Sequence, residues 1–187
     1  AKNTEEFVSE NSDIPYDSSY TAKNRLPAEH AEALFNLPVG SVYGPYMFNG
    51  YYAISKGMGR KAGANARASH ILLSYKGAMR AQPNVTRTKE EAAAKAAELL
   101  NEVKANQDSF MMIAMTNSDD GSKQNSCDLG YFEPGQMTTK FNDYVFNNPV
   151  NSVGLVETEF GYHVIKVTDK QDAVRLATIA RKIEASE

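Results

Sequence analysis

The stretch ETEFGYHVIKVT, Glu157 to Thr168, carries the strongest fold signal in this chain of 187 residues. It begins with a short polar turn, and its second part alternates in a way that places His163 on the same face as Ile165 and Val167. Because that face is apolar, we expect it to pack inward and to bury His163 at least in part. Together with the apolar pair at 155–156, the stretch predicts two strands joined by a turn.

A further strand is predicted from ASHILLSY, Ala68 to Tyr75, which carries His70 in its middle. Beyond a polar loop, Thr88 and Glu91 have the spacing of a capping box, the side-chain pattern that starts many helices. Apolar residues then recur at helical spacing, and the expected buried stripe is Ala92, Ala96, Leu99 and Val103. Asp108 is the expected N-cap of a second short helix, which should bury Phe110, Ile113 and Ala114.

The rest of this region completes a mixed pattern. An exposed loop is predicted at 118–128, an extended piece at 129–137 and a helix at 139–147. The order strand, helices, strand, helix, strand, strand within about 100 residues is typical of an α+β domain.

The N-terminal region gives three further predictions. A short helix is expected at 27–36, with Pro27 in its first turn. Residues 42–56 predict a hairpin, because two aromatic-rich runs flank the turn dipeptide Asn49-Gly50. Residues 57–67, GMGRKAGANAR, lack an apolar period, so we interpret them as a linker, and they match neither glycine-rich motif for phosphate binding.

Composition limits the possible functions. With 42% hydrophobic residues, 23% charged residues and a net charge of −3, the chain is expected to be soluble and globular, and it has no long basic run to bind nucleic acid. The longest apolar run, Met111 to Met115, is far short of the roughly 20 residues of a membrane span. Because the chain starts on Ala1 rather than Met, we expect an excised fragment whose signal or anchor lies outside it.

His70 and His163 are the main candidates for chemistry, and two interpretations are open for them. They are either satisfied core histidines of a sheet or members of a functional site. No closely spaced cluster of cysteine and histidine predicts a metal site, and no Gly-x-Ser-x-Gly elbow predicts a serine hydrolase. The single cysteine, Cys127 beside Asp128, is either an inert loop residue or a thiol nucleophile.

Three motifs in order resemble those of the parvulin family of peptidyl-prolyl cis/trans isomerases: ASHILLS, SDDGSKQNSCDLGYFEPGQMTTKF and VETEFGYHVIKV. The resemblance covers residues 66–170. It implies a four-stranded antiparallel sheet flanked by about four helices, with two histidines on adjacent central strands. It also implies an isomerase of X–Pro bonds that uses no covalent intermediate, cofactor or metal.

The resemblance also implies site residues at the matching positions. The implied catalytic residues are His70, Asp120, Thr158 and His163. The implied pocket for the substrate proline consists of Leu129, Met137 and Phe141, flanked by Phe132 and Gln136, with Phe160 on the rim. The basic residues that select phosphorylated substrates in some parvulins are scattered here, at Lys76, Arg80 and Arg87, so we expect no strict requirement for phosphate.

The N-terminal region repeats the C-terminal one at a constant spacing of 111 residues. FNLPVGSV at 35–42 matches FNNPVNSV at 146–153, which is too regular for chance. The site positions differ, because Leu129, Phe141, Thr158 and His163 align with Ser18, His30, Met47 and Tyr52. We therefore predict a partial, degenerate, non-catalytic parvulin-like unit plus linker at 1–62, followed by the parvulin domain at 63–170.

The segment 171–187 is predicted to be strand-like, because residues 173–186 alternate as a strand does. Two roles are open for it. It either completes the first unit, which would make the catalytic domain an insertion, or it begins a further unit.

Paired parvulin-like units resemble the bacterial envelope folding factors of the PpiD and SurA type. That resemblance implies a periplasmic or cell-envelope location, with any inner-membrane anchor outside this chain, and no membrane contact by the chain itself. The implied partners are unfolded or extended proline-containing polypeptides. A non-catalytic, chaperone-like module that holds extended peptides is the alternative function, and a purely structural tandem is a third.

Overall fold

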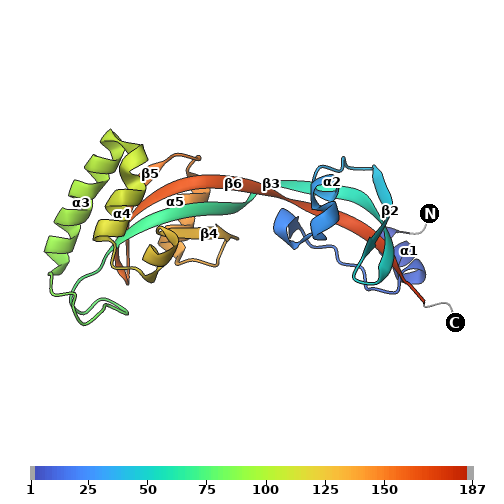
Figure 1. The fold of residues 1–187 in the computed structure, drawn as a ribbon, viewed down its shortest axis with the longest axis horizontal. Helices are drawn as coiled ribbons and strands as arrows, with labels where there is room; N and C mark the ends of the chain where they lie inside the picture. The colour runs from blue at the N-terminus through green and yellow to red at the C-terminus, as the bar shows by residue number, and fades with distance from the viewer. Residues whose placement is uncertain (1–2, 185–187) are drawn as a thin grey trace. The chain divides into compact units, whose positions relative to one another are not determined.

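The computed structural model describes residues 3–184, which divide into two compact units. Residues 3–64 and 171–184 form one, called the split unit here, and Asn65–Lys170 form the other, called the continuous unit. Two long strands, β3 (Tyr51–Leu73) and β6 (Gly161–Lys182), contribute residues to both units (Figure 1). None of the helices within residues 3–184 is long and apolar enough to cross a membrane.

The sheet of the continuous unit has the strand order β4-β3-β6-β5. The outer strands are β4 (Asp128–Phe132) and β5 (Val153–Thr158), and both pair antiparallel with their neighbours. The two predicted histidine strands, β3 and β6, are therefore the central ones. The antiparallel sheet with helices confirms the predicted α+β fold.

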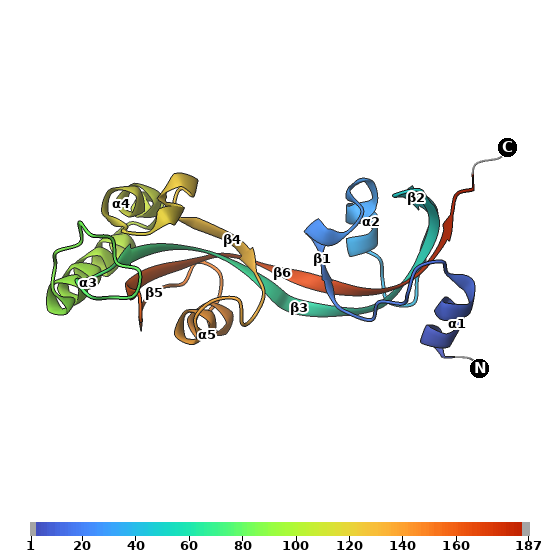
Figure 2. The same ribbon diagram turned by 90° about the horizontal axis from the view of Figure 1, so that it is seen from below.

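Helices cover both faces of this sheet (Figure 2). On one face lie α3 (Lys89–Ala105) and α4 (Phe110–Asn117), and on the other lies α5 (Thr139–Asn147). Two single-turn helices, η3 (Gln107–Ser109) and η4 (Gly121–Asn125), join these elements. The α3 face buries the predicted stripe Ala92, Ala96, Leu99 and Val103, and the α5 face buries Phe132, Phe141, Val145, Ile165 and Val167.

The start of α3 confirms the predicted capping box. The Thr88 side chain accepts a hydrogen bond from the Glu91 N–H, and the Glu91 carboxylate accepts one from the Thr88 N–H. The predicted cap on the next helix is wrong. Asn106, not Asp108, is the capping residue, because its Oδ1 accepts from the Asp108 N–H at 3.1 Å and so starts η3 ahead of α4.

The predicted linker at 57–67 is also wrong, because these residues lie in the middle of β3. Ala66 and Arg67 pair with β4, so the backbone is satisfied by neighbouring strands rather than by water. The glycine content reflects close packing of the chain: a Cβ at Gly57 would lie 2.5 Å from the carbonyl oxygen of Pro38. Small residues here allow close approach of backbone, a use of glycine that composition does not distinguish from flexibility.

The split unit begins with α1 (Thr4–Asn11), β1 (Thr21–Ala22), η1 (Lys23–Arg25), η2 (Ala28–His30), α2 (Ala31–Phe35) and β2 (Val42–Phe48). Its strand order is β1-β6-β3-β2. The predicted hairpin is confirmed, since β2 and β3 pair antiparallel around Asn49-Gly50, both with positive φ. The predicted helix near 27–36 corresponds to η2 and α2.

The chain after Gln171 supplies the end of β6 to this unit. Val174 pairs with Thr21 of β1, and Thr178 Oγ1 lies 2.7 Å from Ser55 Oγ of β3. Ala180 is fully buried in the core of this unit, against Leu34, Tyr46 and Ala53. The predicted strand at 173–186 is thus seen up to Lys182. Residues 183–184 are not part of it, and residues 185–186 lie outside the described part of the chain.

Candidate active site

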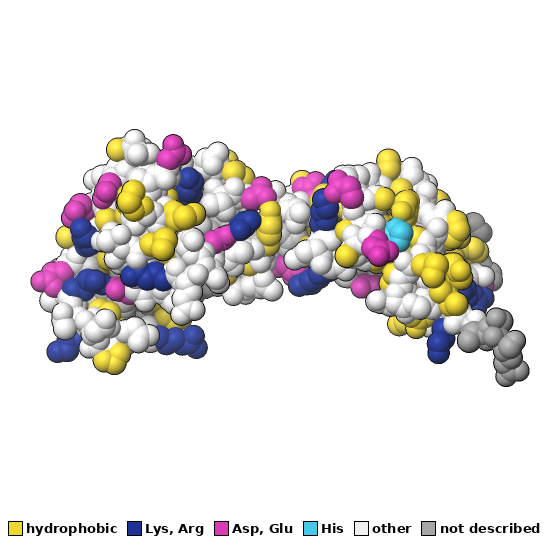
Figure 3. Space-filling view, in the orientation of Figure 1, with side chains coloured by type: hydrophobic (Ala, Val, Ile, Leu, Met, Phe, Trp, Pro, Cys, Tyr) yellow, Lys and Arg dark blue, Asp and Glu magenta, His cyan; other side chains and the backbone are white. Residues whose placement is uncertain are grey.

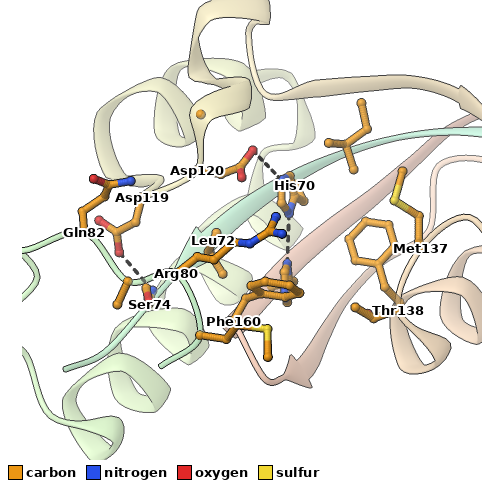
Figure 4. A pocket seen from close by; sticks show the side chains of 16 residues that line it. His70, Leu72, Ser74, Arg80, Gln82, Asp119, Asp120, Met137, Thr138 and Phe160 are labelled. Carbon is orange, nitrogen blue, oxygen red and sulfur yellow. Dashed lines mark hydrogen bonds and ion pairs between the residues drawn. The ribbon is translucent and has the colours of Figure 1, made fainter. Parts of the chain in front are cut away.

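A hollow of about 350 Å³ opens beside the middle of the sheet in the continuous unit (Figure 4). Residues from β3, β4, β6, α5, η4 and the loops between these elements line it. Of the residues implied by the sequence, the structure brings together His70, Asp120, Leu129, Met137, Phe141, Phe160 and His163 at this hollow.

A chain of four polar side chains runs along one edge of the hollow. Asp120 Oδ2 lies 3.1 Å from His70 Nε2, and His70 Nδ1 lies 3.0 Å from His163 Nδ1. His163 Nε2 lies 2.6 Å from Thr158 Oγ1, at the buried end of the chain. The two imidazole rings are stacked, with centroids 5.2 Å apart and planes 13° from parallel. All four implied catalytic residues therefore belong to one hydrogen-bonded network.

The direction of the protons in this chain follows from its carboxylate end. An ionised Asp120 can only accept, so His70 Nε2 must carry a proton. A neutral His163 has one donor and one acceptor nitrogen, so it bonds to His70 Nδ1 through one and to the Thr158 hydroxyl through the other. Thr158 Oγ1 in turn accepts from the Phe160 N–H at 3.2 Å. The four ring nitrogens and the threonine hydroxyl are thus satisfied, as a buried network requires.

The network shifts the acidity of both its carboxylate and its inner histidine. A hydrogen bond from His70, with further bonds from Ser122, holds the pKa of Asp120 far below its usual range, although burial opposes the shift. Burial lowers the pKa of His163 from 6.5 to about 3, and the neighbouring His70 ring adds to the lowering. Asp120 is therefore ionised and His163 neutral near pH 7.

The segment Ser118–Asp120 is bound tightly to β3, which fixes the position of the Asp120 carboxylate. Ser118 Oγ accepts from the N–H groups of Leu72 at 3.0 Å and Asp120 at 3.3 Å. The Asp119 N–H donates to the Leu72 carbonyl at 2.8 Å, and Asp119 Oδ2 accepts from the Ser74 N–H at 2.9 Å. We call this set of bonds the Ser-Asp clasp. It leaves Asp120 free to cap η4 through the Ser122 N–H and to face His70.

The apolar side of the hollow is built around Phe141 on α5. Its ring lies nearly perpendicular to both imidazoles, with centroids 5.7 Å from His70 and 5.5 Å from His163. Half-buried Leu129 and Met137 lie beside it, and Figure 4 shows Met137 and Phe160 at the hollow. The hollow thus has an apolar floor beside a polar edge, close enough together for one small ligand ring to contact both.

Three implied residues lie outside the lining of the hollow. Thr158 is buried behind His163. Phe132 is buried behind Phe141, with ring centroids 6.2 Å apart. Gln136 accepts from the Glu133 N–H at 2.9 Å and so shapes the turn before Met137. These positions support the residues that line the hollow and do not form its surface.

Sequence reasoning identified only Arg80 in one wall of the hollow. It consists of Met79, Arg80, Ala81 and Gln82, all in the loop at 76–86, which we call the pocket loop. Arg80 reaches over the hollow in Figure 4 and has a positive φ of 56°, unusual for a residue with a side chain. The available signal was that this loop leaves the strand of His70 only a few residues after it.

Cys127 is not placed in an exposed loop as predicted. It is fully buried in the core with Ile71 and Val164, and burial raises the pKa of its thiol. The turn that carries it has two consecutive positive φ values, at Ser126 and Cys127, and directs the side chain inward. A buried thiol with a raised pKa is a poor nucleophile, so the thiol interpretation is withdrawn.

Comparisons with known proteins agree with this geometry. Residues 52–171 match the family model described as the PPIC-type PPIASE domain. The chain is 30% identical over 178 residues to the chaperone SurA of Alcanivorax borkumensis, covering 91% of this chain and 39% of that protein. It is 33% identical over 119 residues to the foldase protein PrsA of a Geobacillus strain, covering 63% of this chain and 37% of that protein. It therefore spans less than half the length of these curated relatives.

A solved structure gives the same result for the fold. The peptidyl-prolyl isomerase ESS1 from Candida albicans superposes with a TM-score of 0.54 at 28% identity, over 57% of this chain and 63% of that one. The family model, the relatives and the fold all point the same way. The chain belongs to the parvulin, or PpiC-type, family of peptidyl-prolyl cis/trans isomerases.

Proposed function

We propose that the domain at 63–170 catalyses cis/trans isomerisation of X–Pro bonds in unfolded or extended polypeptides, without a covalent intermediate or a cofactor. The observation that carries this proposal is the hollow itself. Its apolar floor at Phe141 lies next to the polar chain that begins at the ionised carboxylate of Asp120. Family membership supports the same reaction.

The chemistry needs no bond to be broken. The X–Pro bond must rotate through a barrier of about 18–20 kcal/mol that comes from amide resonance. A pocket that holds the proline ring while the preceding carbonyl swings stabilises the twisted state relative to the planar one. Removal from water favours the same state, because the twisted amide is less polar than the planar amide.

Each lining residue has a role in this proposal. Leu129, Met137 and Phe141 hold the proline ring, and Phe160 closes the rim. Asp120 acts through its charge on the carbonyl that moves, rather than as a nucleophile. The remaining members of the polar chain, His70, His163 and Thr158, hold that carboxylate in place. Phe132 and Gln136 support the pocket from behind.

Phosphorylation of the substrate is not a strict requirement in this proposal. Arg87 lies in an ion pair with Asp119 and is not available to a phosphate. Within residues 3–184, Arg80 is a cation at the hollow for which no side-chain partner is found. One cation with no basic neighbour at the hollow favours an acidic residue before proline but does not form a phosphate cluster.

A holding function in the split unit is the second candidate. A second hollow of about 200 Å³ lies there, lined by apolar side chains that include Leu26, Leu34, Tyr46, Phe48 and Leu176. Hydrophobic side chains also gather over this unit on the face shown in Figure 3. Two apolar residues of β2, Val42 and Met47, are exposed. Exposed apolar surface of this kind suits the binding of extended peptides. In this proposal 171–187 complete the unit at 1–62, and the catalytic domain is an insertion.

The cellular setting is proposed from the relatives. Proteins named chaperone SurA and foldase PrsA match this chain, and folding assistance is what both names describe. We therefore propose a folding factor of the bacterial envelope that works in the periplasm, and the likeness to the SurA type supports this location.

NMR exchange spectroscopy on unphosphorylated Ala-X-Pro peptides tests the isomerase. Acceleration is expected for the unaltered protein and should fall in Asp120→Ala and Met137→Ala, while the amide spectrum of each variant stays folded. Peptide binding without acceleration in the unaltered protein would reject catalysis in favour of the holding function.

A further inference from the structure

We propose that Arg87 is a positioning residue of the active site, which holds the pocket loop and the Asp120 segment to the same end of β3. The inference rests on the proposed isomerase function. It concerns a residue that lies outside the lining of the hollow and whose hydrogen bonds go to Ser74 and Asp119.

Arg87 binds two partners with one nitrogen. Its Nη1 donates to the Ser74 carbonyl at 3.0 Å and to the Asp119 carboxylate in an ion pair. Both side chains are largely shielded from solvent, with exposed fractions of 32% for Arg87 and 18% for Asp119. Asp119 Oδ2 already accepts from the Ser74 N–H, so the guanidinium completes a closed set of bonds at the end of β3.

The backbone of Arg87 closes the pocket loop at its base. Its carbonyl accepts from the Lys76 N–H at 2.9 Å, which joins the two ends of the loop. Near the loop's tip, the Met79 N–H donates to the Glu159 carbonyl at 2.9 Å, beside the rim residue Phe160. Arg87 therefore holds two features at once: the base of the pocket loop, which carries Arg80, and the Ser-Asp clasp, which precedes Asp120.

The split unit provides an internal comparison. Ser12 and Asp13 repeat the Ser-Asp clasp, because Ser12 Oγ accepts from the Ala180 N–H at 3.0 Å and Asp13 Oδ2 accepts from the Lys182 N–H at 2.8 Å. The cation on Asp13 is Arg181, a neighbour on the same strand whose side chain is 61% exposed. A clasp can thus form without an arginine supplied from the far end of a loop.

The two clasps differ in the origin of their arginine, and this difference indicates a second role for Arg87. Because the clasp alone needs only a serine, an aspartate and a strand, the half-buried arginine at the loop's base adds the connection to the pocket loop. A guanidinium suits this task, since it offers several donors in a fixed plane. Substrate affinity, which depends on the loop wall, should therefore depend on Arg87 more than the turnover step does.

Arg87→Lys and Arg87→Ala test this in the full chain, by NMR exchange rates over a concentration series of an Ala-Glu-Pro peptide. For Arg87→Ala we expect KM to rise about 10-fold with kcat within about 2-fold, and hydrogen exchange at the Met79 amide to rise at least about 10-fold. Arg87→Lys keeps the charge but lacks the planar guanidinium, so its KM and its Met79 exchange rate should lie between those of the unaltered protein and Arg87→Ala. Arg181→Ala removes the matched ion pair in the split unit and should leave KM unchanged.

Two results would overturn the inference. One is an Arg87→Ala variant with normal KM and normal Met79 exchange. The other is a variant in which exchange rises equally at all core amides, which indicates general destabilisation. If the unaltered protein does not isomerise the peptide, the proposed function fails, and peptide affinity together with Met79 exchange still decides the role of Arg87.

Discussion

The two units share several local features and differ in the polar chain at the centre of their sheets. The continuous unit has a carboxylate, two imidazoles and a hydroxyl, from Asp120 to Thr158. The split unit has three hydroxyls, with Tyr46 2.8 Å from Ser55 and Ser55 2.7 Å from Thr178. Both chains satisfy buried polar atoms across the strands, but only the first carries a charge. Structure alone therefore does not require histidines here.

The scaffold features that recur are specific. The Arg175 guanidinium lies 5.5 Å from the Tyr20 ring centroid, as Arg67 lies 5.7 Å from that of Tyr131. The position of Asp120 in the clasp is taken by Ile14, whose N–H donates to Ser12 Oγ at 3.3 Å. An apolar side chain thus fits the same backbone geometry. The clasp holds the fold, and the residue after it determines whether a carboxylate is present.

The ladders also correct the alignment behind the predicted repeat. The spacing of 111 aligns His163 with Tyr52, but the hairpin pairs are Phe48 with Tyr51 and Thr158 with Gly161. His163 is the second residue after Gly161, and Ala53 is the second residue after Tyr51. Ala53 therefore occupies the strand position that corresponds to His163. Ala53 is 1% exposed and Tyr52 is 51% exposed. A bulge between Tyr43 and Tyr46 shifts the register by one residue, and such a shift reverses the two faces.

Asp120→Ile should give the largest effect, because it places the split unit's residue in the continuous unit. We expect kcat/KM to fall about 100-fold, the scale typical of losing one preorganised electrostatic group. The fold should persist, since Ile14 occupies the same clasp. NMR exchange rates measure the loss and thermal unfolding checks the fold. Activity within about 3-fold of the unaltered protein would show that the carboxylate is not needed.

The free energy of unfolding should depend on pH through the histidine-containing polar chain of the continuous unit, because the split unit's chain consists of hydroxyls alone. His163 has a pKa of about 3 when folded and 6.5 otherwise, so between these values the unfolded chain binds a proton that the folded chain does not. Its contribution to stability is complete above about pH 6.5 and is lost as the pH falls, at up to about 1.4 kcal/mol per pH unit. Urea unfolding across this range measures it.

His163→Gln is the control for that measurement. The difference between the free energies of unfolding of the two proteins should narrow as the pH falls from about 6.5 toward about 3. A constant difference over the whole range would mean that His163 titrates normally in the folded protein.

Tyr46→Phe should have a smaller effect, confined to stability. It removes the first hydroxyl of the split unit's chain and leaves Ser55 bonded to Thr178. The expected cost is about 1 kcal/mol of unfolding free energy, the usual net value of one hydrogen bond. Isomerase rates should not change. A loss of activity in this variant would show that the split unit takes part in catalysis.

Arg80→Glu should give the smallest effect, on substrate preference. Arg80 is partly solvated, so we expect the ratio of kcat/KM for Glu-Pro over Lys-Pro peptides to fall by only about 3-fold to 10-fold, and less at high salt. The variant Lys95→Glu, on the exposed face of α3, makes the same charge change elsewhere. Equal responses in both variants would assign the effect to net charge.

Local signals in the sequence predicted much of this structure. The capping box at Thr88, the turn at Asn49-Gly50 and the helix at 139–147 are each determined by neighbouring residues, and each was predicted correctly. The predicted histidine strands are adjacent at the centre of the sheet, as the family motifs implied.

Other features depend on contacts between distant parts of the chain. Residues 57–67 form a strand because other strands pair with them, which their glycine-rich composition does not indicate. The wall at Met79 and Arg80 is placed by a bond to Glu159, far along the sequence. Cys127 is buried because its turn adopts positive φ values at Ser126 and Cys127, and neither residue type predicts such a conformation.

The division of β6 between the units has a consequence for the order of folding. The split unit needs Thr21 to pair with Val174, whereas the continuous unit lies wholly between these residues. Contacts of such long sequence separation form slowly, because a long loop must first be closed. During synthesis the continuous unit can fold as soon as it has emerged, and its folding shortens that loop. The split unit would then be completed last, on a domain that is already formed.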